Sequence, residues 1–252
     1  MLPLSQRVGV QSWCFRNFKD NAQVVDLLAQ VGSKNLELCG VHCNFRDPVQ
    51  SAQVAAFYQQ AGITIDSIGV ERLSADEAAI RPIFEFAKLA RCRTISVDFL
   101  PQDLPANFKL ADRLAEEYDI RLGIHNHGGY HWLGSMQMLK YVLSITSPRI
   151  GVTLDTAWMM DAKGDPVKAV QELGSRLFAL HFKDFIFHRN RASEDVIVGT
   201  GNLNLAELAK ALRTSNFSGT AVIEYELHPE NPVLPLQGCL KNIVTALAQE
   251  GQ

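Results

Sequence analysis

The sequence predicts an α/β protein with the fold of a (β/α)8 TIM barrel, and two observations lead to this class. Short β-branched runs alternate with longer stretches of helical period along the whole chain. The runs recur about every 30 residues, which is the spacing of parallel βαβ units. Eight such units fit a chain of 252 residues. A doubly wound open sheet is the alternative.

Eight segments carry the strand pattern, beginning with RVGVQS and ending with TAVIEYE. They are residues 7–12, 35–38, 64–70, 94–99, 121–126, 150–155, 177–182 and 220–226. Helix starts lie between them. The dipeptides at 47–48 and 165–166 are both Asp-Pro, which places a capping carboxylate before a proline in the first helical turn. Ser74 and Glu77 form a capping-box pattern at the start of another helix.

The organisation of the chain points to one domain. We find no Gly- or Ser-rich linker, so residues 1–252 are expected to form a single barrel. The longest stretch without a recognisable period runs from Lys183 to about Leu203. In a compact barrel, a loop of that length is more often a cover over an active site than a plain connection.

Composition and charge exclude several classes of partner. The 24 basic and 27 acidic residues give a net charge of −3 without a dense basic run, so we expect neither a nucleic acid nor an anionic membrane as partner. No apolar stretch approaches the roughly 20 residues that span a bilayer, and MLPLSQRV lacks the regions of a signal peptide. The five scattered cysteines favour reduced thiols. We therefore expect a cytoplasmic protein.

Ionisable side chains gather at the ends of four consecutive predicted strands, where a barrel carries its chemistry. They are His125 and His127, then Asp155, then His181 and Lys183, and last Glu224 and Glu226. Residues two apart on a strand share a face, so each pair supplies a deeper and a shallower group. A histidine alone at a strand end is usually a hydrogen-bonded or surface residue. Two imidazoles and two carboxylates from separate strands instead suit a divalent cation.

Four further segments strengthen this reading, because together they resemble the xylose isomerase-like TIM-barrel superfamily. They are LDTAW (154–158), LHFKD (180–184), GTGNLN (199–204) and VIEYE (222–226), which follow the strand with HNH. NLELCG matches the second-strand pattern, so the resemblance covers essentially the whole chain. That superfamily holds sugar and sugar-phosphate isomerases and epimerases, inosose dehydratases and endonuclease IV-type repair enzymes. It implies one divalent metal, with His125, Asp155, His181 and Glu224 as ligands.

One ligand departs from the family pattern. Many epimerases and isomerases of the superfamily carry Glu where His125 stands, and that Glu works with the Glu of strand eight as an acid/base pair. A site with one carboxylate fewer is softer, which favours Mn, Co, Fe or Zn over Mg. Inosose dehydratases similarly have an H-x-H strand. A dehydratase or lyase that eliminates from a keto-inositol or 3-keto-glycoside is therefore the alternative to a sugar isomerase or epimerase.

The resemblance implies enediolate chemistry, in which a proton is removed next to the carbonyl of a sugar. Glu224 is a candidate base, with a water bound to the metal as the alternative. Lys183 and His127 are candidates to donate a proton to an oxygen or a leaving group. A solvated rim position is the alternative for Lys183.

Five residues are predicted to contact the sugar. Glu37, at the end of the second strand, is expected to bind hydroxyls, with a salt bridge at the core edge as the alternative. Gln11 and Trp13 point to one face of the first strand, and an indole can stack on a sugar ring or pack in the core. His131 is expected on a loop over the site. Glu226 is a further candidate or an ordinary salt-bridge partner.

Three alternatives concern the ligand and the function, and one further expectation concerns the assembly. GTGN with Arg189 or Arg191 offers a phosphate site, but the glycines can equally shape the loop, and an unphosphorylated sugar is favoured. A DNA repair enzyme would need a basic groove and more metal ligands than seven histidines readily supply. A sugar-binding barrel without catalysis is the third reading. Because barrels of this superfamily often pair or form tetramers, we expect a homo-oligomer.

Overall fold

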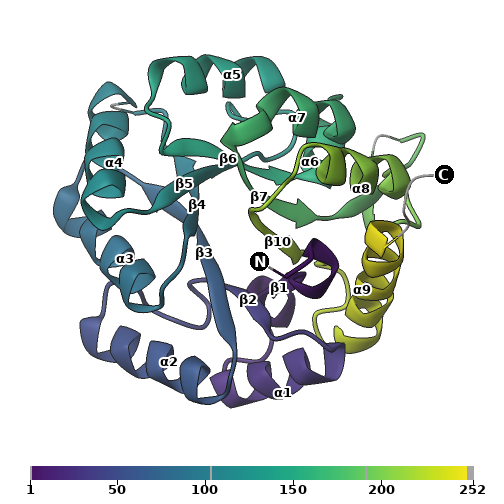
Figure 1. Cartoon of the computed structure of the whole chain (residues 1–252), viewed down its shortest axis with the longest axis horizontal. Helices are drawn as coiled ribbons and strands as arrows, with labels where there is room; N and C mark the ends of the chain where they lie inside the picture. The colour runs from purple at the N-terminus through teal and green to yellow at the C-terminus, as the bar shows by residue number, and fades with distance from the viewer. Residues whose placement is uncertain (1, 103, 191, 249–252) are drawn as a thin grey trace.

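Eight parallel strands close into a barrel in the order β1-β10-β7-β6-β5-β4-β3-β2, with helices around the outside (Figure 1). The structure is a computed structural model and describes residues 2–102, 104–190 and 192–248. The first and last barrel strands pair in parallel, with Gly9 opposite Val222. This closure confirms the TIM barrel and excludes the open doubly wound sheet.

The barrel strands agree closely with the predicted segments. They are β1 (Gly9–Gln11), β2 (Asn35–Leu38), β3 (Thr64–Leu73), β4 (Thr94–Phe99), β5 (Arg121–His125), β6 (Ile150–Asp155), β7 (Leu177–Phe182) and β10 (Thr220–Ile223). The predicted bounds of β2, β4, β6 and β7 are confirmed residue for residue. The last predicted strand is too long, because β10 ends at Ile223. Glu224 and Glu226 therefore lie in the segment that leaves the barrel.

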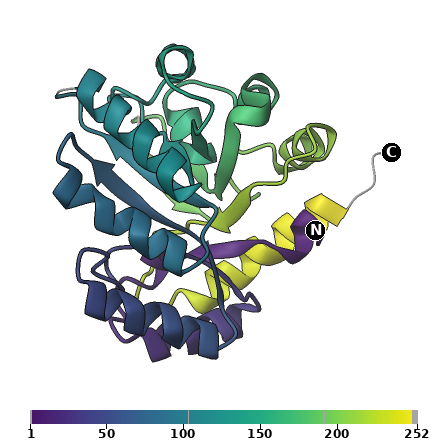
Figure 2. The same cartoon turned by 60° about the vertical axis from the view of Figure 1, so that its left-hand side comes forward.

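Helices ring the strands (Figure 2). Their apolar side chains pack against the strands in one buried core. They are α1 (Asn21–Val31), α2 (Pro48–Gln60), α3 (Glu77–Leu89), α4 (Leu104–Tyr118), α5 (Met136–Ile145), α6 (Thr156–Asp161), α7 (Pro166–Leu173), α8 (Leu205–Thr214) and α9 (Val233–Ala248), with short 3-10 turns η1 (Leu4–Gln6), η2 (Ser12–Phe15) and η3 (Gly174–Arg176). Every residue of β4, β6 and β7 is buried, because helices cover one face and the barrel interior the other. In the described part of the chain, no helix combines the length and apolar character needed to cross a membrane.

The helix caps are partly as predicted. Asp47 and Asp165 each accept hydrogen bonds from two N–H groups of the first turn of α2 and α7, which confirms both caps. The capping box of Ser74 and Glu77 is wrong. Asp76 is the N-cap of α3, and Glu77 is the first helical residue. The carboxylate of Asp76 lies next to the orphan N–H groups, and it accepts two of their hydrogen bonds.

This correction predicts a difference between two neighbouring substitutions. Asp76→Ala removes both hydrogen bonds to the first turn of α3, so we expect it to lower the free energy of unfolding by about 1 kcal/mol. Ser74→Ala removes only an exposed contact and is expected to change it by less than about 0.5 kcal/mol. Urea unfolding of both variants measures the difference. Equal losses would contradict the assignment of Asp76 as the cap.

The long segment after β7 is not structureless as predicted. It contains an antiparallel hairpin of β8 (Asp184–Phe187) and β9 (Ser193–Val196). The hairpin reaches the C-terminal end of the barrel, where the Asp195 carboxylate accepts a hydrogen bond from the backbone N–H of Glu226 at 2.6 Å. The prediction missed the two strands because each is only four residues long and half of their residues are polar.

Candidate functional site

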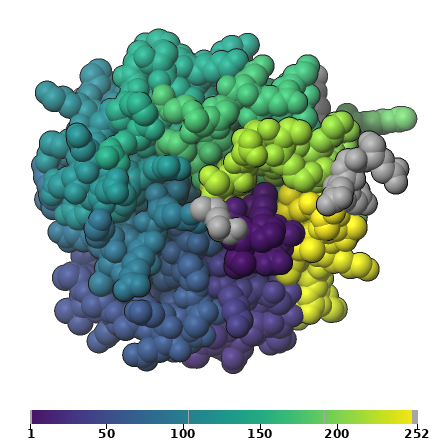
Figure 3. Space-filling view, in the orientation of Figure 1, coloured from purple at the N-terminus to yellow at the C-terminus, as the bar shows by residue number. Residues whose placement is uncertain are grey.

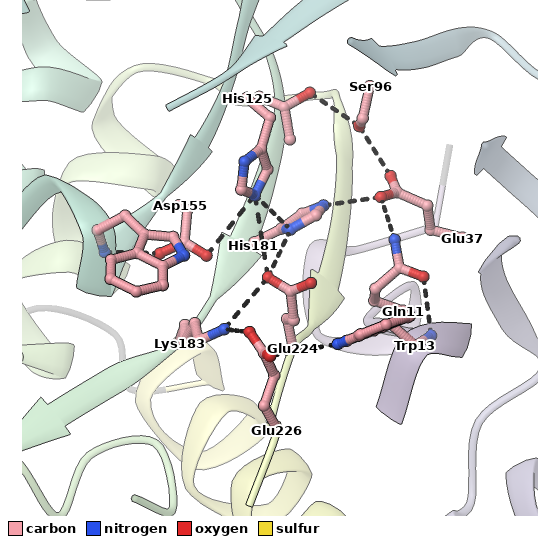
Figure 4. Close-up of polar contacts among 12 residues, drawn as sticks. Gln11, Trp13, Glu37, Ser96, His125, Asp155, His181, Lys183, Glu224 and Glu226 are labelled. Carbon is pink, nitrogen blue, oxygen red and sulfur yellow. Dashed lines mark hydrogen bonds and ion pairs between the residues drawn. The ribbon is translucent and has the colours of Figure 1, made fainter. Parts of the chain in front are cut away.

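The four predicted metal ligands converge at the C-terminal end of the barrel (Figure 4). We call His125, Asp155, His181 and Glu224 the His–Asp–His–Glu cluster. His125 Nε2 lies 3.1 Å from His181 Nδ1, 3.7 Å from Asp155 Oδ2 and 3.9 Å from Glu224 Oε2. His181 Nδ1 lies 3.3 Å from Glu224 Oε2. All four ligand atoms lie within 4.8 Å of one another, and all four residues are buried.

This geometry fits a divalent metal ion. A tetrahedral site with metal–ligand bonds of about 2.1 Å has edges of about 3.4 Å, close to the separations in the cluster. Two nitrogen and two oxygen donors suit a first-row transition metal. Asp155 Oδ2 is buried and has no hydrogen-bond partner among the described residues. Such an oxygen is costly to bury, and a bound cation would offset that cost.

The members of the cluster differ in their electrostatics. Burial would lower the pKa of His181, but Glu37 and Glu224 outweigh it and hold this pKa well above its usual range. Burial raises the pKa of Asp155 to about 8, since the opposing effect of Lys183 is too small to restore its usual value. Burial and the neighbouring His181 hold the pKa of His125 well below its usual range, so its imidazole is neutral and keeps a lone pair. Burial would raise the pKa of Glu224, but Lys183 and His181 outweigh it and keep the carboxylate ionised.

Glu37 supports His181 instead of facing a substrate. Its side chain is 0% exposed and its carboxylate accepts hydrogen bonds from His181 Nε2 at 2.8 Å and Gln11 Nε2 at 2.6 Å. The hydroxyls of Ser67 and Ser96 donate to its other oxygen. The predicted contact with sugar hydroxyls is therefore corrected. By accepting from Nε2, Glu37 leaves Nδ1 of His181 to face the other residues of the cluster, which is the arrangement that a metal-binding histidine needs.

This arrangement predicts that Glu37 controls metal affinity without binding the metal. In Glu37→Gln, the amide removes the negative charge that holds His181, so we expect metal affinity to fall by about 10- to 100-fold. Glu71→Gln is the matched control, because Glu71 is also a buried carboxylate but pairs with Arg46 and lies outside the cluster. Competition titration with a chelating dye measures both variants. A similar loss of metal affinity in both variants would show that removing any negative charge near the cluster weakens the metal, and it would contradict a specific role for Glu37.

A cavity of about 570 Å³ opens beside the cluster, and both His125 and Glu224 line it. Trp13 lines the cavity and is 37% exposed, but it stands in η2 and not on the first strand as predicted, and its contact with a sugar stays a prediction. Gln11 also lines the cavity but is only 1% exposed. Its amide donates to Glu37 and to the backbone oxygen of Gly69, so it positions Glu37 and has little surface for a substrate. Trp158 lines the cavity too, and the sequence reasoning missed it.

Lys183 and Glu226 form an ion pair at the edge of the cavity (Figure 4). The Lys183 side chain is 1% exposed, and its ammonium also lies 3.5 Å from Glu224 Oε2. Glu226 lines the cavity and accepts a hydrogen bond from the Trp13 indole at 3.2 Å. Lys183, Glu224 and Glu226 lie beyond the ends of β7 and β10, so these contacts, and not the period of a strand, bring the three side chains together.

A second group of polar residues lies next to His127. The His127 ring lies 4.5 Å from the His125 ring and 5.0 Å from that of His131, and His127 lines the cavity. Burial lowers the pKa of His127, so the imidazole is neutral. His131 Nε2 lies 3.4 Å from Asp98 Oδ1, and His131 does not line the cavity, so its contact with a sugar stays a prediction. Asp98 was missed, although it stands near the end of β4, where the strand-end rule would have found it.

The GTGN loop is already occupied by a carboxylate of the chain. The N–H groups of Gly199, Gly201 and Leu203 donate to Asp184 at 3.0, 2.9 and 2.9 Å. A phosphate bound by this loop would need the same N–H groups. The glycines therefore shape the loop around Asp184 and do not form a phosphate site. Arg189 lies in the exposed hairpin turn, and Arg191 lies outside the described residues.

The family of the chain follows from comparison with known proteins. Residues 103–243 match the family model described as xylose isomerase-like TIM barrel, so the chain belongs to this family. It is 31% identical over 121 residues to a D-psicose 3-epimerase of Enterocloster bolteae, which covers 47% of this chain and 38% of the relative. It is 28% identical over 117 residues to a 3-oxo-isoapionate decarboxylase of Pectobacterium atrosepticum, covering 44% and 42%. The chain thus spans less than half the length of these curated relatives.

Two solved structures share the fold over almost their whole length. The IolI protein, solved with a bound zinc atom, has a TM-score of 0.76 at 14% identity, covering 96% of this chain and 98% of that one. The probable 3-DHS dehydratase AsbF of Bacillus anthracis has a TM-score of 0.74 at 17% identity, covering 93% and 97%. At these identities the likeness shows the fold alone.

Proposed function

We propose that the protein is a divalent-metal-dependent sugar isomerase or epimerase that removes a proton next to a carbonyl. The observation that carries this proposal is the convergence of the His–Asp–His–Glu cluster beside a cavity of about 570 Å³. The similarity to a D-psicose 3-epimerase supports it. We include in the proposal a transition metal ion, with Mn, Co, Zn or Fe favoured over Mg, because two of the four donors are imidazole nitrogens.

The cavity suits an unphosphorylated monosaccharide. Its volume lies within the range of about 300–1,000 Å³ that is typical of small-molecule sites. The indoles of Trp13 and Trp158 line it, and an aromatic face can pack against the C–H face of a sugar ring. Glu226 lies beside Trp13 and is the candidate to bind a hydroxyl. Because the Asp184 carboxylate already accepts hydrogen bonds from the N–H groups of the GTGN loop, these groups are not free to bind a phosphate.

The residues of the chain divide the chemistry between them. A divalent metal, when bound, would stabilise the charge that develops on the substrate oxygen as the proton leaves. Glu224 is the candidate base, since it lines the cavity and Lys183 and His181 keep its carboxylate ionised and able to accept a proton. Lys183 is buried and already paired, so we assign it to positioning Glu224. His127 lines the same cavity and is the candidate to donate a proton to an oxygen or a leaving group.

A dehydratase or lyase acting on a keto-inositol or 3-keto-glycoside is the second candidate. The observation that favours it is the cavity's pairing of one ionised carboxylate, Glu224, with a neutral imidazole, His127. Epimerisation with two equivalent bases needs a second carboxylate, and His125 stands in its place. β-Elimination needs only one base and one acid.

One experiment separates the two functions. The metal-loaded protein is incubated in deuterated water with a panel of ketoses, keto-inositols and 3-keto-glycosides, and followed by proton NMR and ultraviolet absorbance. Deuterium at the carbon beside the carbonyl together with an epimeric or isomeric product is the expected result. A new enone absorbance would establish the lyase. Binding of sugars without either signal, after loading with Mn, Co, Fe and Zn in turn, would contradict both and leave a non-catalytic barrel.

A further inference from the structure

A second cavity, of about 400 Å³, lies at the opposite end of the barrel, where the strands begin. Its wall includes the first residues of β4, β5 and β10, which are Thr94, Arg121 and Thr220. Figure 3 looks onto this end, where the purple N-terminal residues lie beside the yellow-green segment that leads into β10. β5 carries Arg121 at one end and His125 at the other, so this cavity lies about 13 Å from the His–Asp–His–Glu cluster.

The cavity has an excess of positive charge. Three arginines line it, Arg93, Arg121 and Arg149, together with a single aspartate, Asp119. Asp119 pairs with Arg149 at 2.9 Å, and Asp66, which does not line the cavity, lies 4.0 Å from Arg93. Arg121 instead lies over the Phe178 ring, 5.2 Å from its centroid, and within the described ranges it has no carboxylate partner within 4 Å. A guanidinium stacked in this way keeps its N–H edge available for an anion.

A buried hydroxyl on the same wall also lacks a partner. Thr220 is 3% exposed, and its Oγ1 makes no hydrogen bond to any of the residues that the structure describes. Because a buried hydroxyl without a partner is unfavourable, an acceptor in the cavity would satisfy it. Arg121 and Thr220 belong to different strands, β5 and β10, so their donors approach the cavity from separate parts of its wall.

We propose that this cavity binds a phosphate-class oxyanion, either free or as the phosphate group of a small metabolite. Arg93, Arg121 and Arg149 supply charge and N–H donors from the starts of three neighbouring strands, and Thr220 supplies a hydroxyl donor. A tetrahedral oxyanion offers acceptors in every direction, which suits donors that surround a cavity at the starts of several strands. A planar carboxylate presents its two acceptors in one plane and would leave part of this wall unsatisfied.

The test measures phosphate binding to protein that has been freed of metal with a chelator and then dialysed, so that the anion has no metal to bind. Inorganic phosphate is titrated by calorimetry at constant ionic strength. We expect saturable binding that Arg121→Gln weakens about tenfold or more, because a charge-assisted donor is lost. The matched control is Arg113→Gln, which removes an exposed guanidinium of α4 that pairs with Glu77 and Glu117. Its affinity for phosphate is expected to be unchanged.

A second variant tests the hydroxyl donor independently of the arginines. Thr220→Val replaces the hydroxyl by a methyl group of similar size, and we expect it to fold normally while weakening phosphate several-fold. Ribose 5-phosphate in a parallel titration distinguishes the source, because tighter binding than inorganic phosphate identifies a phosphorylated metabolite and equal binding identifies the free ion. No saturable binding, equal affinity in both test variants and the parent, or an equal loss in Arg113→Gln would overturn the proposal.

Discussion

Asp155→Asn is expected to lose the bound metal and, when metal-free, to be more stable than the parent protein near pH 8. Asp155 is fully buried, and its pKa is raised from 3.8 to about 8, mainly by burial. The folded parent therefore holds a proton that the unfolded chain has released. The contribution of Asp155 to stability is therefore fully present below about pH 4 and is lost as the pH rises to about 8. The amide of the variant has no such proton to lose, and its side-chain oxygen can still cap the N–H of Trp158.

Elemental analysis and urea unfolding with a chelator at pH 5 and pH 8 measure both effects. We expect about one equivalent of a transition metal in the parent and an affinity lower by more than about 100-fold in Asp155→Asn. Asp98→Asn is the control, since Asp98 is a buried carboxylate near the end of β4 outside the cluster. Retained metal in Asp155→Asn, or a metal-free parent that gains stability relative to the variant as the pH rises, would contradict the assignment.

The fold could be predicted because its signal repeats along the chain. Each βαβ unit contributes a short apolar run and a helical period, so one misplaced end does not change the class. The errors lie at strand ends, as at Ile223, where the backbone turns away while the sequence still alternates. The hairpin after β7 was missed for a related reason. Its four-residue strands pair only with each other, and most of their side chains are partly or fully exposed.

The convergence of the cluster could also be predicted, because residues at the ends of parallel strands meet at one end of the barrel, and the choice of His125 and Glu224 within it came from the family resemblance. The contacts that support the cluster could not be predicted. Glu37 and His181 are 144 residues apart and meet across the barrel interior, which depends on how far each side chain reaches. From sequence alone, Glu37 at a strand end looks like a residue open to substrate. Trp158 was missed although it stands three residues after Asp155, where the first turn of α6 aims it back at the cavity.

Glu224→Gln is expected to lower kcat by about 10²- to 10⁴-fold while the barrel stays folded, because a positioned base contributes a factor of that size. Glu226→Gln is the matched control. Glu226 lines the same cavity, but the Lys183 ammonium and the Trp13 indole already hold it, so we expect a smaller loss that falls mainly on KM.

The readout of the Glu224→Gln prediction is solvent deuterium incorporation into a ketose at saturating Mn, with sugar affinity measured separately by calorimetry. Saturating metal compensates for the weaker ligand that an amide provides, so a remaining defect reports the lost base. Lost exchange with sugar binding retained would also separate an enzyme from a barrel that only binds. If exchange continues at the parental rate in Glu224→Gln, the base is another group in the cavity, and His127, whose imidazole is neutral, becomes the candidate.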